Sequence, residues 1–176
     1  MHRNIELKNF ITVLVDSREK KNEHILKYFT MRGIKYKVTK LNVGDYSLAI
    51  HDDDFAKALG YPFAIDYRGS ITIERKASLE ELSNNFTRDR KRFQNEFEKG
   101  QGKIHLMIEN ATYDDIVFGR YKTKFNEKAF VRSLNTWKFR YNAHIDFVSK
   151  ETAGNYIYYT LISSFIEELR NRNINY

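Results

Sequence analysis

The sequence predicts an α/β fold in which a central mixed sheet is flanked by helices. Short apolar runs rich in β-branched residues alternate along the chain with longer segments whose apolar residues recur every three or four positions. Strands and helices that alternate in this way form a layered α/β sandwich. The 176 residues contain one proline, Pro62, and neither a low-complexity linker nor an internal repeat is evident. We therefore expect a single domain over residues 1–176.

Six segments have the composition of strands. The first is the apolar run from Thr12 to Val15, which ends in Asp16 and is typical of a buried strand. In the second, polar residues alternate with Tyr36 and Val38, as they do in a strand. The predicted strands after the first are residues 35–40, 45–50, 70–75, 104–108 and 145–148.

Four segments have the apolar spacing of helices. Residues 22–32 form the first, which Gly33 is well suited to end. A long helix is expected from Ser78 to the glycines at 100 and 102, where Ser78 and Glu81 fit a capping box. The other two predicted helices are residues 126–141 and 151–170.

The composition favours an intracellular protein with a polyanionic partner. The net charge is +7 and the pI about 9.4, a balance that suits nucleic acid, although many basic proteins bind nothing acidic. The absence of cysteine excludes disulfides and thiolate metal sites. No apolar run is long enough to span a membrane, and the N-terminus lacks the apolar core of a signal peptide. We expect a cytoplasmic protein, and the many Lys, Asn and Ile residues suggest an AT-rich bacterial or phage genome.

Three short stretches each place an acid near one end of a predicted strand: Asp16 and Glu74 near the ends of theirs, and Asp45 at the start of its strand. They are Val15-Asp16-Ser17-Arg18-Glu19, Gly44-Asp45-Tyr46 and Ile73-Glu74-Arg75-Lys76. Phosphodiester hydrolysis needs a divalent metal ion to neutralise the scissile phosphate and to activate water. Mg²⁺ prefers one or two carboxylates, which Asp45 and Glu74 supply if their strands are neighbours. Glu74 and Lys76 point to the same face of a strand, so Lys76 can orient the attacking water or stabilise the phosphate.

Each stretch has an ordinary interpretation when it is taken alone. A Gly-Asp-Tyr is usually a turn, a Glu-Arg-Lys is usually a solvated charge run, and the Asp16 stretch is usually a strand end. The order and the conjunction of the three carry the prediction. An acid followed later by Glu-x-Lys is the active-site pattern of the restriction-endonuclease-like, PD-(D/E)XK fold.

Over roughly residues 10–148 the sequence resembles the nuclease domain of the XPF family, whose signature is GDXnERKX3D after a V-D-x-R-E strand. The resemblance implies an Mg²⁺- or Mn²⁺-dependent endonuclease that cuts branched, flapped or bubble DNA. It implies that Asp16, Asp45 and Glu74 are the acidic metal-site residues. It also implies that Lys76 is the catalytic base or phosphate stabiliser, and that Arg18 and Arg75 serve the structure of the site or the phosphate.

Two features depart from the family pattern. The last acid of the motif is Glu80, where the family has Asp. The gap between Asp45 and Glu74 is long, and residues 51–69 are predicted to be an inserted loop with one short helix at most. The loop could act as a lid or read the substrate; its three Asp residues could bind metal, or they could simply be solvated. We expect a nuclease domain alone, without the family's helix-hairpin-helix and helicase domains.

Two basic segments are candidates for DNA contact. Arg88, Lys91 and Arg92 have the spacing of one helix face, which could bind phosphates or could be solvated surface. Residues 120–124 form a second basic segment that contains a tyrosine. Its basic residues are Arg120, Lys122 and Lys124.

Other functions compete with a branched-DNA nuclease. One is a non-catalytic DNA-binding or scaffold subunit, although such subunits lose the acids and the lysine that this chain keeps. Another is a nuclease that acts on duplex DNA or on RNA. The last predicted helix also suggests a homodimer through residues 156–169, because it is apolar on more than one face. One stripe contains Tyr158, Ile162, Phe165 and Leu169; the alternative is a helix buried on both sides within one chain.

Overall fold

The computed structural model describes residues 9–51, 53–58, 71–101 and 103–171. The described residues form a six-stranded sheet in the order β2-β1-β3-β4-β5-β6. Strand β3 runs antiparallel to both of its neighbours, and the other neighbouring strands are parallel. The strands are β1 (Ile11–Asp16), β2 (Tyr36–Thr39), β3 (Tyr46–Ile50), β4 (Thr72–Lys76), β5 (Ile104–Glu109) and β6 (His144–Val148). The predicted mixed sheet and its six strands are confirmed.

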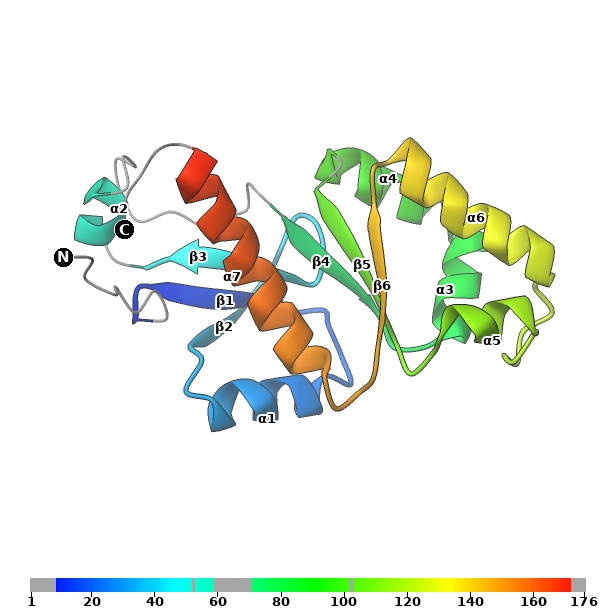
Figure 1. Ribbon diagram of the computed structural model, residues 1–176, viewed down its shortest axis with the longest axis horizontal. Helices are drawn as coiled ribbons and strands as arrows, with labels where there is room; N and C mark the ends of the chain where they lie inside the picture. Colours follow the sequence, from blue (N-terminus) through cyan, green and yellow to red (C-terminus); the bar gives the residue numbers. More distant parts are fainter. Residues whose placement is uncertain (1–8, 52, 59–70, 102, 172–176) are drawn as a thin grey trace.

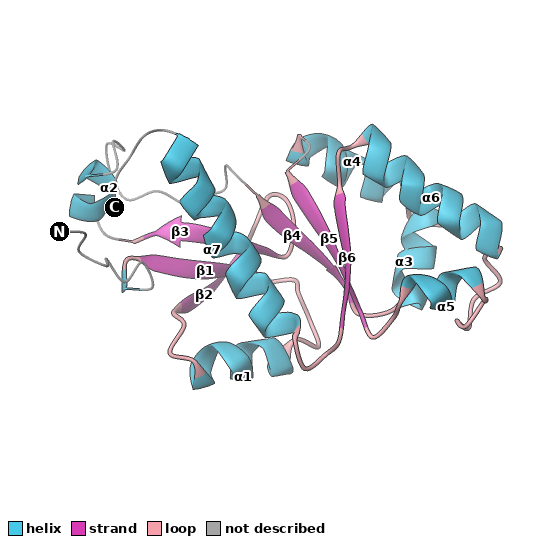
Figure 2. Ribbon diagram, viewed as in Figure 1, coloured by secondary structure: helices cyan, strands magenta, loops and turns pink. Residues whose placement is uncertain are grey.

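Helices cover both faces of this sheet (Figures 1 and 2). Helices α1 and α7 pack on one face, and α3, α4, α5 and α6 pack on the other. The helices are α1 (Glu23–Met31), α2 (Asp53–Ala58), α3 (Leu79–Phe86), α4 (Arg90–Gly100), α5 (Tyr113–Val117), α6 (Glu127–Arg140) and α7 (Ala153–Asn171). The fold is therefore a three-layer arrangement with the sheet in the middle.

Each face of the sheet has its own hydrophobic core. On one face, Phe29 of α1 and Ile157 of α7 pack with residues of β1 and β3. On the other, Trp137 of α6 lies among the rings of Phe86 and Phe93. Alternate residues of the central strands divide between the two cores because successive side chains of a strand point to opposite faces.

Strands β3 and β4 meet over a short length. Their register is confined to Tyr46 opposite Ile73, supported by a hydrogen bond of 2.7 Å from the amide of Asp45 to the carbonyl of Ile73. By contrast, β4 pairs with β5 along its whole length, from Thr72 to Lys76. The acids predicted to form the site thus lie at the seam where β3 joins β4.

The prediction of one long helix from Ser78 is wrong, because the structure has two helices there, α3 and α4. The hydroxyl of Thr87 donates to the carbonyl of Ser83 at 2.8 Å, a local bond that competes with helix continuation. The backbone of Thr87 also leaves the helical region. The predicted cap at Ser78 is confirmed, since its side chain accepts from the amide of Glu81. Helix α5, which the apolar pattern did not predict, begins with a capping box made by Thr112 and Asp115.

Within the predicted insert, residues 53–58 form helix α2, whose Phe55 stacks on Phe10 with ring centroids 4.4 Å apart. Position 52 and residues 59–70 lie outside the described residues, so the proposed lid is not tested. None of the described helices is long and apolar enough to cross a membrane.

Helix α7 buries a single stripe in the core. The stripe contains Ile157, Leu161, Phe165 and Leu169, spaced four residues apart. Phe165 and Leu169 were expected on the dimer stripe with Tyr158 and Ile162; that grouping is wrong, because a spacing of four places them with Ile157 and Leu161 instead. Tyr158 and Ile162 are partly buried against the same core.

Candidate active site

Strand β4 separates the three residues of the Glu74-Arg75-Lys76 motif by face. Glu74 and Lys76 point towards α3 and α4, whereas Arg75 points towards α1. All three side chains are largely buried. A strand, unlike a helix, places the acid and the lysine side by side and the arginine behind them.

Lys76 lies in a cage of acidic and aromatic side chains. Its Nζ donates to Oε1 of Glu74 at 2.6 Å and lies 3.6 Å from Oε1 of Glu81. It also lies 5.0 Å from the centroid of the Phe93 ring, in reach of a cation–π contact. Burial opposes the charge of Lys76, but the neighbouring carboxylates of Glu74 and Asp45 outweigh it and raise the pKa, so the ammonium is retained.

Asp45 is held by the backbone of both neighbouring strands. Its amide donates to Ile73, its carbonyl accepts from the amide of Asp16, and its Oδ2 accepts from the amide of Arg75 at 2.8 Å. These bonds place the Asp45 carboxylate against the middle of β4. The acids of the second and third motifs therefore meet, as predicted from the sequence.

Gly44 allows this turn to approach β4 closely. Its φ angle is +69°, and an added Cβ atom would lie 2.8 Å from the side chain of Thr72. The amide of Gly44 donates to Oε1 of Glu96 on α4 at 3.0 Å. The Gly-Asp turn is thus fixed from two sides, by β4 and by α4.

An open pocket of about 410 Å³ lies in front of these residues. It is predominantly polar and is bounded by the turn after β1, the Gly-Asp turn, β4, α3 and α4. The lining residues are Arg18, Glu19, Asn42, Gly44, Asp45, Glu74, Arg75, Lys76, Glu81, Asn85, Arg92, Phe93, Glu96 and Lys99.

The acids of the pocket are crowded. Burial raises the pKa of Asp45 well above its usual value, and the charges of Glu74 and Glu19 raise it further. Burial likewise raises the pKa of Glu74, while Lys76 opposes the shift. Carboxylates that repel one another in this way are stabilised by an added cation.

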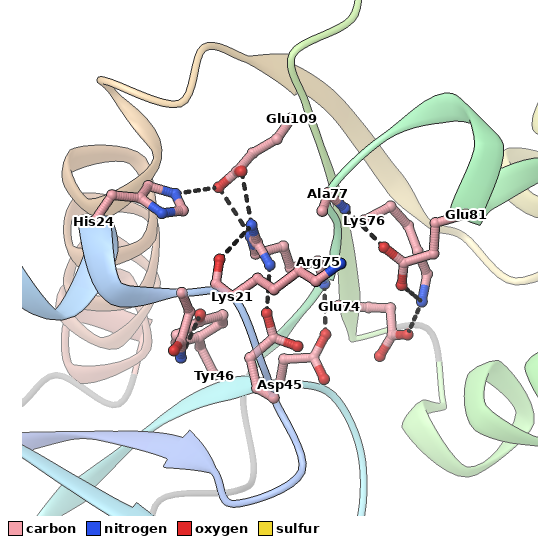
Figure 3. A network of polar contacts seen from close by, with 12 residues as sticks. Lys21, His24, Asp45, Tyr46, Glu74, Arg75, Lys76, Ala77, Glu81 and Glu109 are labelled. Carbon is pink, nitrogen blue, oxygen red and sulfur yellow. Dashed lines mark hydrogen bonds and ion pairs between the residues drawn. The ribbon is translucent and has the colours of Figure 1, made fainter. Parts of the chain in front are cut away.

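Arg75 organises a buried network behind the pocket (Figure 3). Its guanidinium donates to both oxygens of Glu109, at 2.9 and 2.8 Å, and to Oε1 of Glu19 at 2.5 Å. Glu109 also contacts Nε2 of His24 at 2.9 Å. Arg75 therefore links β5 and α1 to Glu19, an acid that lines the pocket.

The carboxylate of Asp16 accepts hydrogen bonds from other residues of the chain. Its oxygens accept from the amide and guanidinium of Arg18, at 2.7 and 2.8 Å, and from the amide of Leu41 at 2.8 Å. Asp16 is fully buried and is not among the residues that line the pocket, whereas Arg18 is. The assignment of Asp16 to the metal site stays a prediction.

Two adjacent acids at the start of α3 point in different directions. Oε1 of Glu80, the residue matched to the last acid of the motif, accepts from the amide of Lys122 at 3.0 Å, and Glu80 does not line the pocket. Glu81 lines the pocket, and its Oε2 accepts from the amide of Ala77 at 2.9 Å. Of the two acids at the start of α3, Glu81 is the one that lies near Lys76.

The predicted DNA contacts fall into two surface groups. Lys91 and Arg92 are exposed on α4, Arg88 precedes this helix, and Arg92 lines the pocket. The second group lies between α5 and α6, and its basic residues are all exposed. They are Arg120, Lys122 and Lys124, of which Arg120 pairs with Asp115 at 3.4 Å.

The residues present fit a divalent cation of the Mg²⁺ type. Among the described residues, no three His, Asp or Glu side chains form a ready-made metal cluster. Mg²⁺ needs fewer protein ligands, because it keeps several waters and takes substrate oxygens. Asp45 and Glu74, with raised pKa values in one polar pocket, are a donor set of that kind.

The sequence patterns did not identify several residues at or behind the pocket. Glu19 stands in the first motif, but its contact with Arg75 depends on the turn after β1. Glu96, Lys99 and Asn85 come from helices, where nothing in the spacing distinguishes them from surface polar residues. Glu109 ends an apolar strand, and that position is the signal that could have identified it.

Comparisons with known proteins relate this chain to the ERCC4 domain and to structures of XPF. The model of the ERCC4 domain family matches residues 15–160. A structure of XPF from Aeropyrum pernix is 16% identical, with a TM-score of 0.59 over 91% of this chain and 69% of that chain. XPF from Aeropyrum pernix in complex with DNA is 16% identical, with a TM-score of 0.61 over 89% of this chain and 66% of that chain.

The chain thus spans about two thirds of the length of these XPF chains. The likeness confirms the predicted restriction-endonuclease-like fold. A search of curated proteins found no match.

Proposed function

The chain belongs to the ERCC4 domain family, a family of nucleases that generally use divalent metal ions, and from this premise we propose that it is a metal-dependent DNA endonuclease. The observation that carries the proposal is the meeting of Asp45, Glu74 and Lys76 in one polar pocket. Asp45 directly precedes β3, which runs antiparallel to the strand that carries Glu74 and Lys76. The buried Lys76 keeps its charge among acids. A non-catalytic scaffold would not need this costly arrangement of buried charges.

Asp45 and Glu74 would hold an Mg²⁺ or Mn²⁺ ion. Such an ion, when bound, neutralises the scissile phosphate and favours ionisation of the attacking water. Lys76 contributes an ammonium that hydrogen-bonds a phosphate oxygen or orients the water. Arg75 supports the site indirectly by donating a hydrogen bond to Glu19, which lines the pocket. Asp16 supports it by accepting hydrogen bonds from Arg18 and from the amide of Leu41.

Basic side chains around the rim of the pocket would bind the phosphates of DNA. Arg18 and Arg92 line it, and Lys91 and Arg88 extend the positive surface along and before α4. The loop containing Arg120, Lys122 and Lys124 is a second contact region, joined to the start of α3 by the bond between Lys122 and Glu80. Such contacts add affinity without reading sequence.

Branched or flapped DNA is the proposed substrate. The test is digestion of flap, fork, Holliday-junction, duplex and single-stranded DNA with Mg²⁺ or Mn²⁺. We expect a branched substrate to be cut fastest and excess EDTA to abolish cutting. Equal cutting of plain duplex would refute the branch preference, and undiminished cutting in EDTA would refute the metal dependence.

The assignment of the residues is tested by Asp45→Asn, Glu74→Gln and Lys76→Met. Each change should reduce cleavage by at least about a hundred-fold, because it removes a metal charge or the ammonium. Circular dichroism and thermal unfolding confirm that each variant is folded. Wild-type cleavage by any one of them would remove that residue from the site.

We also propose that two copies pair through α7. An open groove of about 660 Å³ runs beside this helix and is lined by Ile71, Val148 and Tyr156, with the exposed Tyr159 on its rim. The rest of the lining is polar and includes Thr160, Ser163 and Glu167, so a second copy would cover a mixed apolar and polar surface, as is common at interfaces. Light scattering should show a dimer at tens of micromolar. A Tyr159→Glu variant should be monomeric, and a monomeric wild type would end this proposal.

A further inference from the structure

Lys76 makes only one short hydrogen bond to the described residues, although its ammonium has three hydrogens to donate. That bond, 2.6 Å long, goes to Oε1 of Glu74. Glu74 is also one of the two carboxylates that the proposed function assigns to the metal ion. A dication beside Glu74 would compete with the ammonium for the same carboxylate and repel it. A second acceptor is therefore needed if Lys76 is to keep its place in the pocket.

Helix α3 presents such an acceptor. Figure 3 shows the Lys76 ammonium between the carboxylates of Glu74 and Glu81. Oε1 of Glu81 lies 3.6 Å from Nζ, which is within ion-pair range but longer than a hydrogen bond. Its other oxygen accepts from the amide of Ala77, next to Lys76 in the chain. This bond anchors Glu81 where its free oxygen faces the ammonium.

Asn85 adds a second observation at the same place. It lies one helical turn after Glu81, on the same face of α3, and it lines the same pocket. It is only 4% exposed, and its Oδ1 has no hydrogen-bond partner among the described residues. A buried amide oxygen ordinarily has a donor. An unpartnered acceptor on this wall of the pocket indicates that a donor arrives there during function.

We propose that Glu81, assisted by Asn85, is a positioning residue that takes over the Lys76 ammonium when the metal ion occupies Glu74. The proposal rests on the proposed function and assigns to Glu81 a task that Glu80 does not perform. Glu80 accepts instead from the amide of Lys122 and is not part of the pocket wall. The transfer moves Lys76 by a short distance along the pocket and keeps its charge facing the phosphate.

The test compares Glu81→Gln with the matched control Glu80→Gln. Both changes remove one charge from the first turn of α3, and the glutamine carbonyl can still accept the backbone hydrogen bond in each case. Mn²⁺ binding to the folded chain is measured by calorimetry, and cleavage is measured separately as kcat and KM.

We expect Glu81→Gln to weaken Mn²⁺ binding and lower kcat by about ten-fold each, because Lys76 then has only Glu74 to pair with. KM for DNA should not rise, and Glu80→Gln should leave Mn²⁺ binding unchanged.

A third variant separates this transfer from a direct effect of the Glu81 charge on the metal ion. In a Lys76→Met background no ammonium competes for Glu74, so Glu81→Gln should no longer weaken Mn²⁺ binding. A ten-fold loss that persists in that background would overturn the proposal, as would equal behaviour of Glu81→Gln and Glu80→Gln. Undiminished Mn²⁺ binding by Glu74→Gln would instead overturn the proposed metal site, and this inference with it.

Discussion

Replacing Glu109 by glutamine should destabilise the chain by removing the charge that Arg75 is paired with. Glu109 is 1% exposed and accepts two hydrogen bonds from the Arg75 guanidinium and one from His24. Burial opposes its ionisation, but the bonds from Arg75 and His24 outweigh it and lower the pKa of Glu109, so the carboxylate is charged at neutral pH. In Glu109→Gln the amide nitrogen would face the donors of Arg75 at close range.

The size of the effect follows from the neighbours of Arg75. Removing one partner of a buried ion pair costs roughly 3–5 kcal/mol. Glu19 still contacts Arg75 at 2.5 Å, and the carbonyl of Lys21 lies within 3.4 Å, so part of the charge stays compensated. We expect a loss of about 3 kcal/mol, which lowers the Tm of a chain of this length by about 6–12 °C.

Thermal and urea unfolding followed by circular dichroism measure this loss. The control is Glu167→Gln, which breaks an exposed ion pair with Arg170 and should change stability by less than about 0.5 kcal/mol. If Glu109→Gln lowered Tm no more than Glu167→Gln does, the buried network would not carry the stability assigned to it here.

Three further changes test other parts of the structure. Gly44→Ala forces a Cβ atom against β4 at a positive φ angle, so urea unfolding should show a loss of about 2–3 kcal/mol. Burial and the charge of His144 lower the pKa of His105 to about 4. The unfolded side chain takes up its proton near pH 6.5, whereas the folded one does so only near pH 4. The free energy of unfolding should therefore be highest above pH 6.5 and fall by at most about 3 kcal/mol as the pH drops towards 4. In His105→Gln this part of the pH dependence should be absent. Arg88→Ala with Arg92→Ala should weaken DNA binding and reduce the slope of log K against log salt by about 2; an unchanged slope would make both residues ordinary surface.

The order of strands and helices could be predicted from the sequence because it depends on local periodicity. The run from Thr12 to Asp16 reports directly on burial and is a strand in the structure. The alternation around Tyr36 also marks a strand, although Tyr36 and Val38 are exposed there. The break at Thr87 could not be predicted in this way, since the apolar stripe continues through it from Phe86 to Phe93. The break coincides with the non-helical backbone of Thr87, which the apolar spacing does not report.

The candidate site was predictable as a set of residues and not as an arrangement. Spacing within β4 places Glu74 beside Lys76, and the structure agrees. Which acid after the motif faces Lys76 depends on how α3 leaves the strand, and the choice of Glu81 over Glu80 is therefore a tertiary property. The role of Asp16 likewise depends on the chain near Leu41, far away in the sequence.

Helix α7 closes the core that covers β1 and β3, although it lies far from these strands in the sequence. Ile157, Leu161 and Phe165 of α7 pack in this core with residues of β1 and β3. Contacts between residues so far apart in the sequence form late in folding, because a long stretch of chain must first be ordered. Asp45 directly precedes β3, so its place beside Glu74 depends on a core that is complete only when α7 has docked.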